Sequence, residues 1–156
     1  LPERFDLTYA DKDNERRRPI MIHRVIYGSI ERFFGILIEH FAGKFPIWMA
    51  PIQAVLLPIN DELVSYAKEI QALLEKEGIR TEIDGRTESL KKKIRDAQIN
   101  YVPLIITCGA KEKEAGTVSV RTLSGKVKYG VSVDDFVKIT LSHIRERKPD
   151  PEIFTD

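Results

Sequence analysis

One histidine stands in a segment where an apolar residue would be expected. His23 interrupts Ile20–Ile26, which is otherwise apolar except for the neighbouring arginine. Histidine is a common zinc ligand, and a zinc site needs three or four protein ligands. The other candidate ligands, His40, Cys108 and His143, do not lie at ligand spacing from it. Two interpretations stay open: a hydrogen-bonded core histidine, or one ligand of a metal site that this chain cannot complete by itself.

A second candidate is Arg32, which follows Gly28-Ser29 in the first turn of an expected helix. A cation is disfavoured there because the N-terminus of a helix carries positive partial charge. The same feature makes a helix N-terminus an anion site, and the planar guanidinium suits a nucleotide. The alternative is a solvated arginine that pairs with Glu31 or Glu39.

A third candidate is the basic segment from Arg86 to Arg95, which holds five Lys or Arg and one Glu. Charge alone leaves two interpretations open: a solvated helix face, or a patch that contacts phosphates. The run Lys111–Glu114 predicts a surface turn by its composition. The sequence contains no dinucleotide-binding glycine motif, Walker loop or metalloprotease motif.

Composition limits the classes of protein. The chain has 156 residues, of which 42% are hydrophobic and 31% charged, which excludes a disordered chain and a membrane protein. A single cysteine excludes an internal disulfide framework and favours a reducing, cytoplasmic setting. The net charge is only +1, so nucleic acid would have to be bound by a local patch.

The first 45 or so residues cannot form a core of their own. Alternation predicts strands over Phe5–Tyr9 and Ile20–Ile26, with a charged turn between them, and helical spacing predicts a helix from Ser29 that Gly43 ends. Two strands and one helix cannot cover one another. We therefore expect residues 1–45 to be the end of a larger domain, followed by a proline-bounded linker over 44–51.

The remaining residues predict a regular α/β domain. Strands and helices alternate, which implies parallel pairing with right-handed crossovers, and a hairpin and a last helix follow. We expect a central mixed, mostly parallel sheet flanked by helices. The expected strands are Gln53–Pro58, Ile79–Ile83, Val102–Thr107, Val118–Thr122 and Lys126–Gly130, and the expected helices are Asp61–Glu77, Ser89–Asn100 and Val133–Arg147.

The order of residues adds a family resemblance. Met21–Arg24 followed by Gly28–Phe33 resembles motif 3 of the class II aminoacyl-tRNA synthetases. Gly35–Pro46 and Leu1–Tyr9 look like threonyl-tRNA synthetase, and the likeness covers nearly the whole chain but not the residues from Lys148 on. It implies that residues 1–45 end the catalytic domain and that residues 46–156 form the anticodon-binding domain.

The resemblance also implies roles for the candidates above. His23 would be one of three protein ligands of a Zn²⁺ ion, with a Cys and a His upstream of this chain. Arg32 would be the catalytic motif 3 arginine that stacks on the adenine of ATP, bound with Mg²⁺, and Ser29 would line the substrate pocket. Glu112 and Arg121 would contact the anticodon bases.

Arg95 would then hold phosphates, with Lys91–Lys93 nearby. These positions converge only if the hairpin lies beside Val102–Thr107. The simple alternative for Glu112 and Arg121 is a surface ion pair, worth about 1 kcal/mol or less.

The implied parent is a cytoplasmic, homodimeric ligase that attaches threonine to its tRNA with ATP and does not need a membrane. Motifs 1 and 2 are missing here, so we expect this piece alone to be inactive. Two alternatives remain. One is a prolyl-, glycyl- or histidyl-type synthetase with the same C-terminal domain. The other is a non-catalytic tRNA-binding module.

Overall fold

The computed structural model describes residues 1–150 and 153. The chain divides into two compact units, Leu1–Leu37 and Ile38–Asp156. Helix α1, Ile30–Phe41, begins in the first unit and ends in the second. Among the described residues, no helix combines the length and apolar character that crossing a bilayer requires.

The first unit contains one short hairpin. Strands β1, Tyr9–Ala10, and β2, Arg16–Arg17, pair antiparallel. The prediction of a strand over Phe5–Tyr9 is therefore wrong for most of its length. Residues 2–6 form turns instead, because the Phe5 amide donates to the Leu1 carbonyl at 3.0 Å and fixes the chain in a bend.

The predicted strand over Ile20–Ile26 is also not formed. These residues have neither helical nor strand structure. Their apolar side chains lie in solvent, with Ile20 91% and Ile22 85% exposed. A strand needs a neighbour to satisfy its backbone groups, and no described segment of the chain pairs with this one.

The predicted helix after Ser29 is confirmed. The Ser29 carbonyl accepts from the amide of Phe33, and the Ser29 hydroxyl lies 3.4 Å from the amide of Arg32. The helix ends at Phe41, and Gly43, two residues later, has a φ of +76° and donates its amide to the Ile38 carbonyl. A glycine reaches this left-handed conformation without steric cost.

The second unit is built on a five-stranded sheet in the order β4-β3-β5-β6-β7. The two strands beside β3 are parallel to it, and β6 and β7 form an antiparallel hairpin next to β5. Four of the five strands thus run in one direction, which confirms the predicted mixed, mostly parallel α/β sheet. The strands are β3 Ala54–Pro58, β4 Thr81–Ile83, β5 Leu104–Cys108, β6 Thr117–Thr122 and β7 Val127–Ser132.

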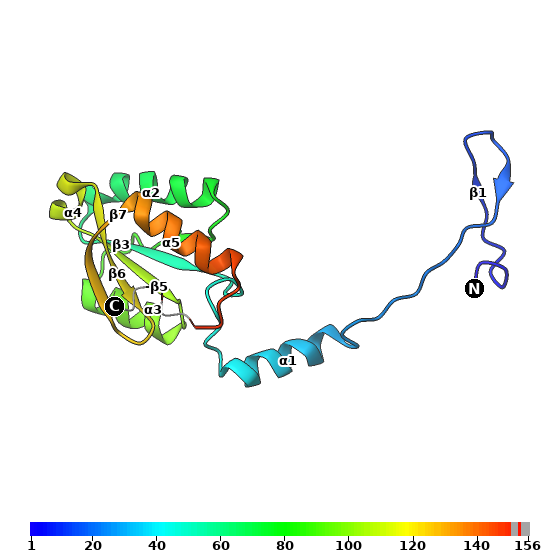
Figure 1. The fold of residues 1–156 in the computed structure, drawn as a ribbon, viewed down its shortest axis with the longest axis horizontal. Helices are drawn as coiled ribbons and strands as arrows, with labels where there is room; N and C mark the ends of the chain where they lie inside the picture. The colour runs from blue at the N-terminus through cyan, green and yellow to red at the C-terminus, as the bar shows by residue number, and fades with distance from the viewer. Residues whose placement is uncertain (151–152, 154–156) are drawn as a thin grey trace. The chain divides into compact units, whose positions relative to one another are not determined.

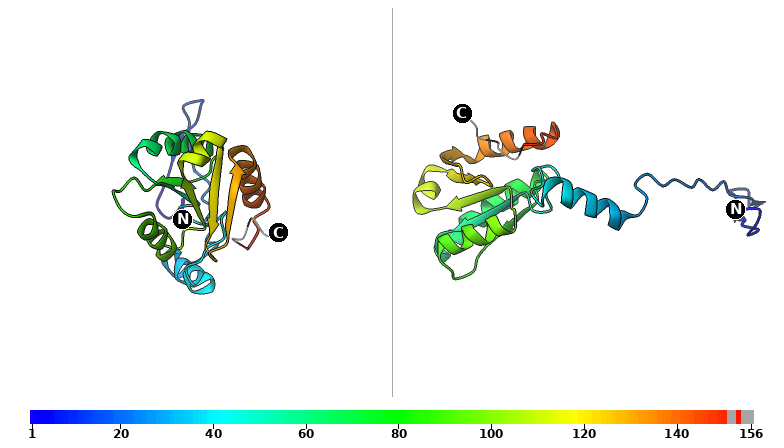
Figure 2. Two further views of the ribbon diagram at one scale, coloured as in Figure 1. Left: turned by 90° about the vertical axis from the view of Figure 1, so that its left-hand side faces the viewer. Right: turned by 90° about the horizontal axis from the view of Figure 1, so that it is seen from below.

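Helices cover both faces of this sheet (Figures 1 and 2). Helices α2 and α5 contribute Ile70 and Phe136 to the larger core cluster, together with Leu56 of β3. Helix α3 packs through Ala97 and Ile94 on the opposite face. The helices are η1 Asp61–Leu63, α2 Val64–Lys76, α3 Leu90–Ile99, α4 Ala110–Ala115 and α5 Val133–Arg145.

Helix α4 corrects one prediction. Lys111–Glu114 was expected to be a surface turn, but it lies inside this six-residue helix. Gly109 precedes the helix in an extended conformation, and Gly116 ends it with a φ of +65°. The run carries no apolar residue, so it has none of the periodicity by which a helix is recognised in a sequence.

The linker before β3 is held by two side chains. Gln53 is buried, donates through Nε2 to the Ile47 carbonyl at 2.8 Å and accepts from the Arg80 amide at 2.9 Å. The Arg80 guanidinium donates to the carbonyls of Trp48, Ala50 and Pro51. The start of the domain is thereby fixed to the strand that follows α2.

Candidate nucleic-acid interface

Glu112 and Ser119 meet where α4 lies against the sheet. The Ser119 hydroxyl on β6 donates a 2.7 Å hydrogen bond to Oε1 of Glu112 on α4. Ser119 is only 5% exposed, whereas Glu112 is partly exposed. The carboxylate is therefore held through Oε1 by a buried donor.

The backbone around Glu112 is tied to the sheet as well. The Tyr66 hydroxyl lies 2.9 Å from the Thr117 carbonyl and 3.3 Å from the Glu112 carbonyl. At Gly109 a Cβ atom would collide with the Glu112 carboxylate. The absence of a side chain at Gly109 is thus what leaves room for this carboxylate.

Arg121 lies two residues after Ser119 on the same strand. Side chains alternate along a strand, so both residues are on one face of the sheet. Arg121 is partly exposed, and its Nη1 donates to the Gly125 carbonyl at 3.0 Å in the hairpin turn. Among the described residues, Glu112 and Arg121 form no ion pair with each other. The alternative of a surface ion pair between Glu112 and Arg121 is therefore not found.

Arg95 belongs to α3 and is exposed. Helix α3 packs on the sheet face that contains Ile105, and Ile105 is the direct partner of Arg121 in the register between β5 and β6. Arg95 is therefore carried by the helix on the same side of the sheet as Arg121. The sequence analysis required the hairpin to lie beside Val102–Thr107 for these residues to converge, and the β6–β7 hairpin does lie beside β5.

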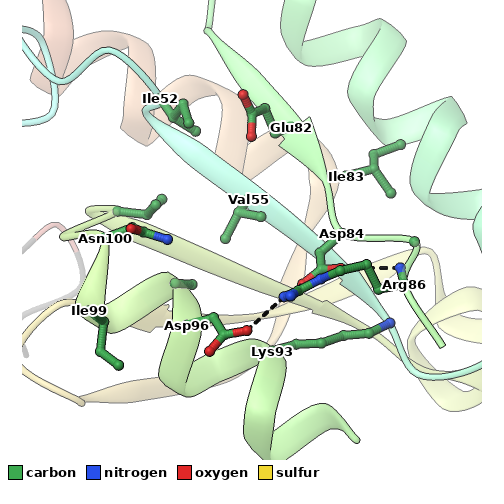
Figure 3. Close-up of a pocket in the computed structure, with 13 residues that line it drawn as sticks. Ile52, Val55, Glu82, Ile83, Asp84, Arg86, Lys93, Asp96, Ile99 and Asn100 are labelled. Carbon is green, nitrogen blue, oxygen red and sulfur yellow. Dashed lines mark hydrogen bonds and ion pairs between the residues drawn. The ribbon is translucent and has the colours of Figure 1, made fainter. Parts of the chain in front are cut away.

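The basic residues before and within α3 differ in their burial and in their partners. Arg86 donates to both Asp84 and Asp96 (Figure 3). Lys93 is 4% exposed, and its Nζ lies 3.3 Å from the Pro58 carbonyl. These side chains line a cavity of about 470 Å³ between β4 and α3. Lys93 therefore differs from the basic residues near it in the sequence, because its side chain is buried in the domain.

The remaining basic residues of α3 stay candidates for phosphate contacts. Lys91 and Lys92 are exposed, as Arg95 is. Lys92 forms an ion pair with Glu88 one turn earlier in the sequence. An exposed pair of this kind exchanges readily for another anion because it contributes little free energy.

The site residues in the first unit do not form a complete centre. His23 is exposed, and its Nε2 lies 2.9 Å from the Met21 sulfur. No group of three or more His, Cys, Asp or Glu side chains in the described part of the chain could hold a metal ion. The residues described here therefore do not fit a zinc site by themselves, and His23 supplies at most one ligand.

Ser29 and Arg32 lie together at the start of α1. The Ser29 hydroxyl donates to Oε2 of Glu31 at 2.6 Å, and this hydrogen bond lowers the pKa of Glu31. Arg32 is exposed and forms no ion pair among the described residues, so the alternative of a pairing with Glu31 or Glu39 is not found. Its guanidinium is available at the beginning of the helix.

The structure thus brings Glu112, Arg121 and Arg95 to one side of the sheet, and Ser29 and Arg32 to one helix start. Sequence analysis gave no role to Ser119 or Gly109. The signal that could have identified Ser119 is its spacing of two residues from Arg121, because this spacing places both side chains on one face of a strand.

Comparisons with known proteins show what each part of the chain is similar to. Residues 53–143 match the family described as "Anticodon binding domain", and residues 1–41 match "tRNA synthetase class II core domain (G, H, P, S and T)". The predicted boundary between 45 and 46 falls between these two matched ranges and stays a prediction.

Among curated proteins, the threonine–tRNA ligase of Desulforapulum autotrophicum is 69% identical over 98% of this chain, and that of a Thermus thermophilus strain is 46% identical over 97%. The chain spans only about a quarter of the length of these relatives, 24% and 23%.

Two solved structures show the same fold. The RNA-binding domain of threonyl-tRNA synthetase from Cryptosporidium parvum covers 90% of this chain and 36% of its own, with a TM-score of 0.69 and 31% identity. Histidyl-tRNA synthetase from Nostoc covers 63% of this chain and 23% of its own, with a TM-score of 0.55 and 23% identity, and supports the fold alone. The chain therefore belongs to the family described as "Anticodon binding domain".

Proposed function

We propose that this chain is the anticodon-reading part of a threonine–tRNA ligase, together with the last segment of its catalytic domain. The observation that carries the proposal is the placement of Glu112 and Arg121 at one face of β6, beside a helix that presents Arg95. High identity to threonine–tRNA ligases over nearly the whole chain supports threonine over proline, glycine or histidine as the amino acid.

The chemistry of the side chains fits the reading of an unstacked base. Arg121 can present two parallel donors to the acceptor edge of guanine. The Glu112 carboxylate can accept from the Watson–Crick donors of guanine once that base is turned out of the anticodon loop. Arg95 adds a fixed positive charge for phosphates, which strengthens binding without selecting a sequence.

The first unit contributes to the parent enzyme's ATP site in this proposal. Arg32 is the catalytic residue that contacts the adenine of ATP, which is bound with Mg²⁺, and Ser29 lies against the substrate. His23 would join zinc ligands that the described residues do not include, and no step is assigned to that ion. The parent would act as a cytoplasmic homodimer on ATP, threonine and threonine tRNA.

The test is tRNA binding by the full-length protein, measured with cognate tRNA and with an anticodon-swapped tRNA. Arg121→Ala should cost about 1–3 kcal/mol on the cognate tRNA and relax the preference between the two. Lys92→Ala is the matched control: it should weaken both tRNAs alike and lower the salt slope by about one. An unchanged ratio of affinities in Arg121→Ala would overturn the assignment.

A further inference from the structure

The Glu112 carboxylate is unusually constrained for a partly exposed side chain. Glutamate loses about 1.5–2 kcal/mol of rotamer entropy when it is ordered, so a solvated glutamate samples many positions. Here Oε1 is held by the Ser119 hydroxyl at 2.7 Å, and the carboxylate fits against the bare Cα of Gly109. The Glu112 side chain therefore loses this rotamer entropy when the protein folds, and not when a ligand binds.

The hydrogen bond also determines which acceptors remain. A carboxylate has about four acceptor positions on its two oxygens. The Ser119 donor occupies one of them on Oε1, and Ser119 is too deeply buried to be displaced easily by a ligand. The other oxygen, Oε2, lies beside Gly109, and the acceptor positions that remain on this partly exposed residue are the ones a base with two adjacent donors would use.

Glu112 could instead serve only to cap helix α4. Glu112 is the third residue of α4 after Gly109, which is the position of the carboxylate in a capping box. A capping role affects the stability of α4 and does not depend on which tRNA is bound. The two roles therefore separate in an experiment that compares tRNAs.

We infer that Ser119 and Gly109 are positioning residues for anticodon discrimination: the Ser119 hydroxyl orients the Glu112 carboxylate, and Gly109 leaves the space that it occupies. This inference rests on the proposed function, because it assumes that Glu112 reads a base. It adds two residues that never touch the RNA themselves.

The first test is Ser119→Ala in the full-length protein, with the ratio of affinities for cognate and anticodon-swapped tRNA as the readout. Loss of a charge-assisted hydrogen bond should lower this ratio by roughly tenfold. Ser119→Thr keeps the hydroxyl and should retain most of the ratio. Melting temperature is measured for each variant. A lowered ratio that Ser119→Thr fails to restore would contradict the role of the hydroxyl.

The second test is Gly109→Ala, which leaves the hydroxyl in place and displaces the carboxylate. It should lower the ratio as Ser119→Ala does. Gly85→Ala is the matched control, because a Cβ there would meet open space and the backbone has no positive φ. Normal discrimination in Gly109→Ala would overturn the inference.

Glu112→Gln and Arg121→Ala separate failure of the inference from failure of the proposed function. Glutamine keeps the length of the side chain and suits the same helix position. If both variants relax discrimination and Ser119→Ala does not, the positioning role is wrong and the proposed function stands. If neither relaxes it, the assignment of this surface to the anticodon is itself wrong.

Discussion

Arg86 joins the end of β4 to α3: its Nη2 lies 2.7 Å from Oδ2 of Asp84 and 2.8 Å from Oδ2 of Asp96. The hydrogen bonds from Arg86 lower the pKa of Asp84. A carboxyl whose pKa is lower in the folded state adds stability above its unfolded pKa of about 3.9, and this is lost as the pH falls through the folded pKa. The pair therefore contributes to stability at neutral pH and not in strong acid.

Arg86→Met should consequently destabilise the chain at pH 7, and the difference from the wild type should shrink below about pH 4. Urea unfolding at pH 7, 5 and 3 measures this. In an Asp84→Asn background the same substitution should have a smaller effect, because its main partner is already gone. A difference that does not change with pH would show that Arg86 acts by packing alone.

Gln53 gives a prediction about the linker. Gln53→Ala removes both hydrogen bonds to Ile47 and Arg80 and leaves two backbone groups without partners. Each such group costs about 1–3 kcal/mol when buried, so the loss of stability should be about 2 kcal/mol or more. Gln71→Ala is the control, since that residue makes a single 3.3 Å bond to Thr81 and should cost about 1 kcal/mol. Equal losses in the two variants, measured by urea unfolding, would contradict the bridging role of Gln53.

The elements of the second unit were predictable because their signals are local. The helix after Ser89 has a Ser cap and apolar residues at helical spacing, and the strand ending at Cys108 is a continuous apolar run. These patterns specify an element and the face that it buries. The position of the hairpin beside β5 followed from the tendency of consecutive elements to be neighbours.

The features that the sequence did not predict correctly share a physical cause. Each depends on a contact with a residue that lies far away in the sequence. Ile20–Ile26 has the composition of a strand, but a strand forms only beside another. Lys93 looks like Lys91 and Lys92 in a charge pattern, and only the packing of α3 against Pro58 separates it from them. The hydrogen bond between Glu112 and Ser119 joins a helix to a strand and has no local signature.

Cys108 gives a prediction about chemical reactivity. Burial raises the pKa of its thiol to about 12, and the nearby charge of Glu112 adds to this. Thiolate is the reactive form, so at pH 8.5 alkylation by iodoacetamide should be roughly 1,000-fold slower in the folded chain than in urea. Because the folded pKa is raised, the stability from this group is present below about pH 8.5 and declines as the pH rises towards 12. Cys108→Ala should remove that decline, and rapid labelling of the native chain would contradict the burial of the thiol.

His23 gives a prediction about metal content. A single exposed imidazole leaves the other zinc positions to water, so the ion is easily lost. The 156-residue chain should therefore contain no stoichiometric zinc after dialysis against a chelator, as measured by elemental analysis. In the full-length protein His23→Ala should reduce the zinc that is retained, while His40→Ala, a histidine of α1, should not. Zinc retained by the isolated chain would mean that its residues form a site in another way.

The last prediction concerns the segment around Ile20–Ile26. Helix α1 has no buried residue, and an isolated helix of 12 residues is marginal in water. Amides in residues 1–45 of the isolated chain should therefore exchange with solvent much faster than those in residues 52–145, where β3 and β5 are buried. In the full-length protein the same apolar residues should become protected, because the rest of the catalytic sheet can pair with them. Uniform protection in a monomer of the isolated chain would show that the first unit is stable without that sheet, and equally fast exchange in both proteins would show that the segment is not a strand in either.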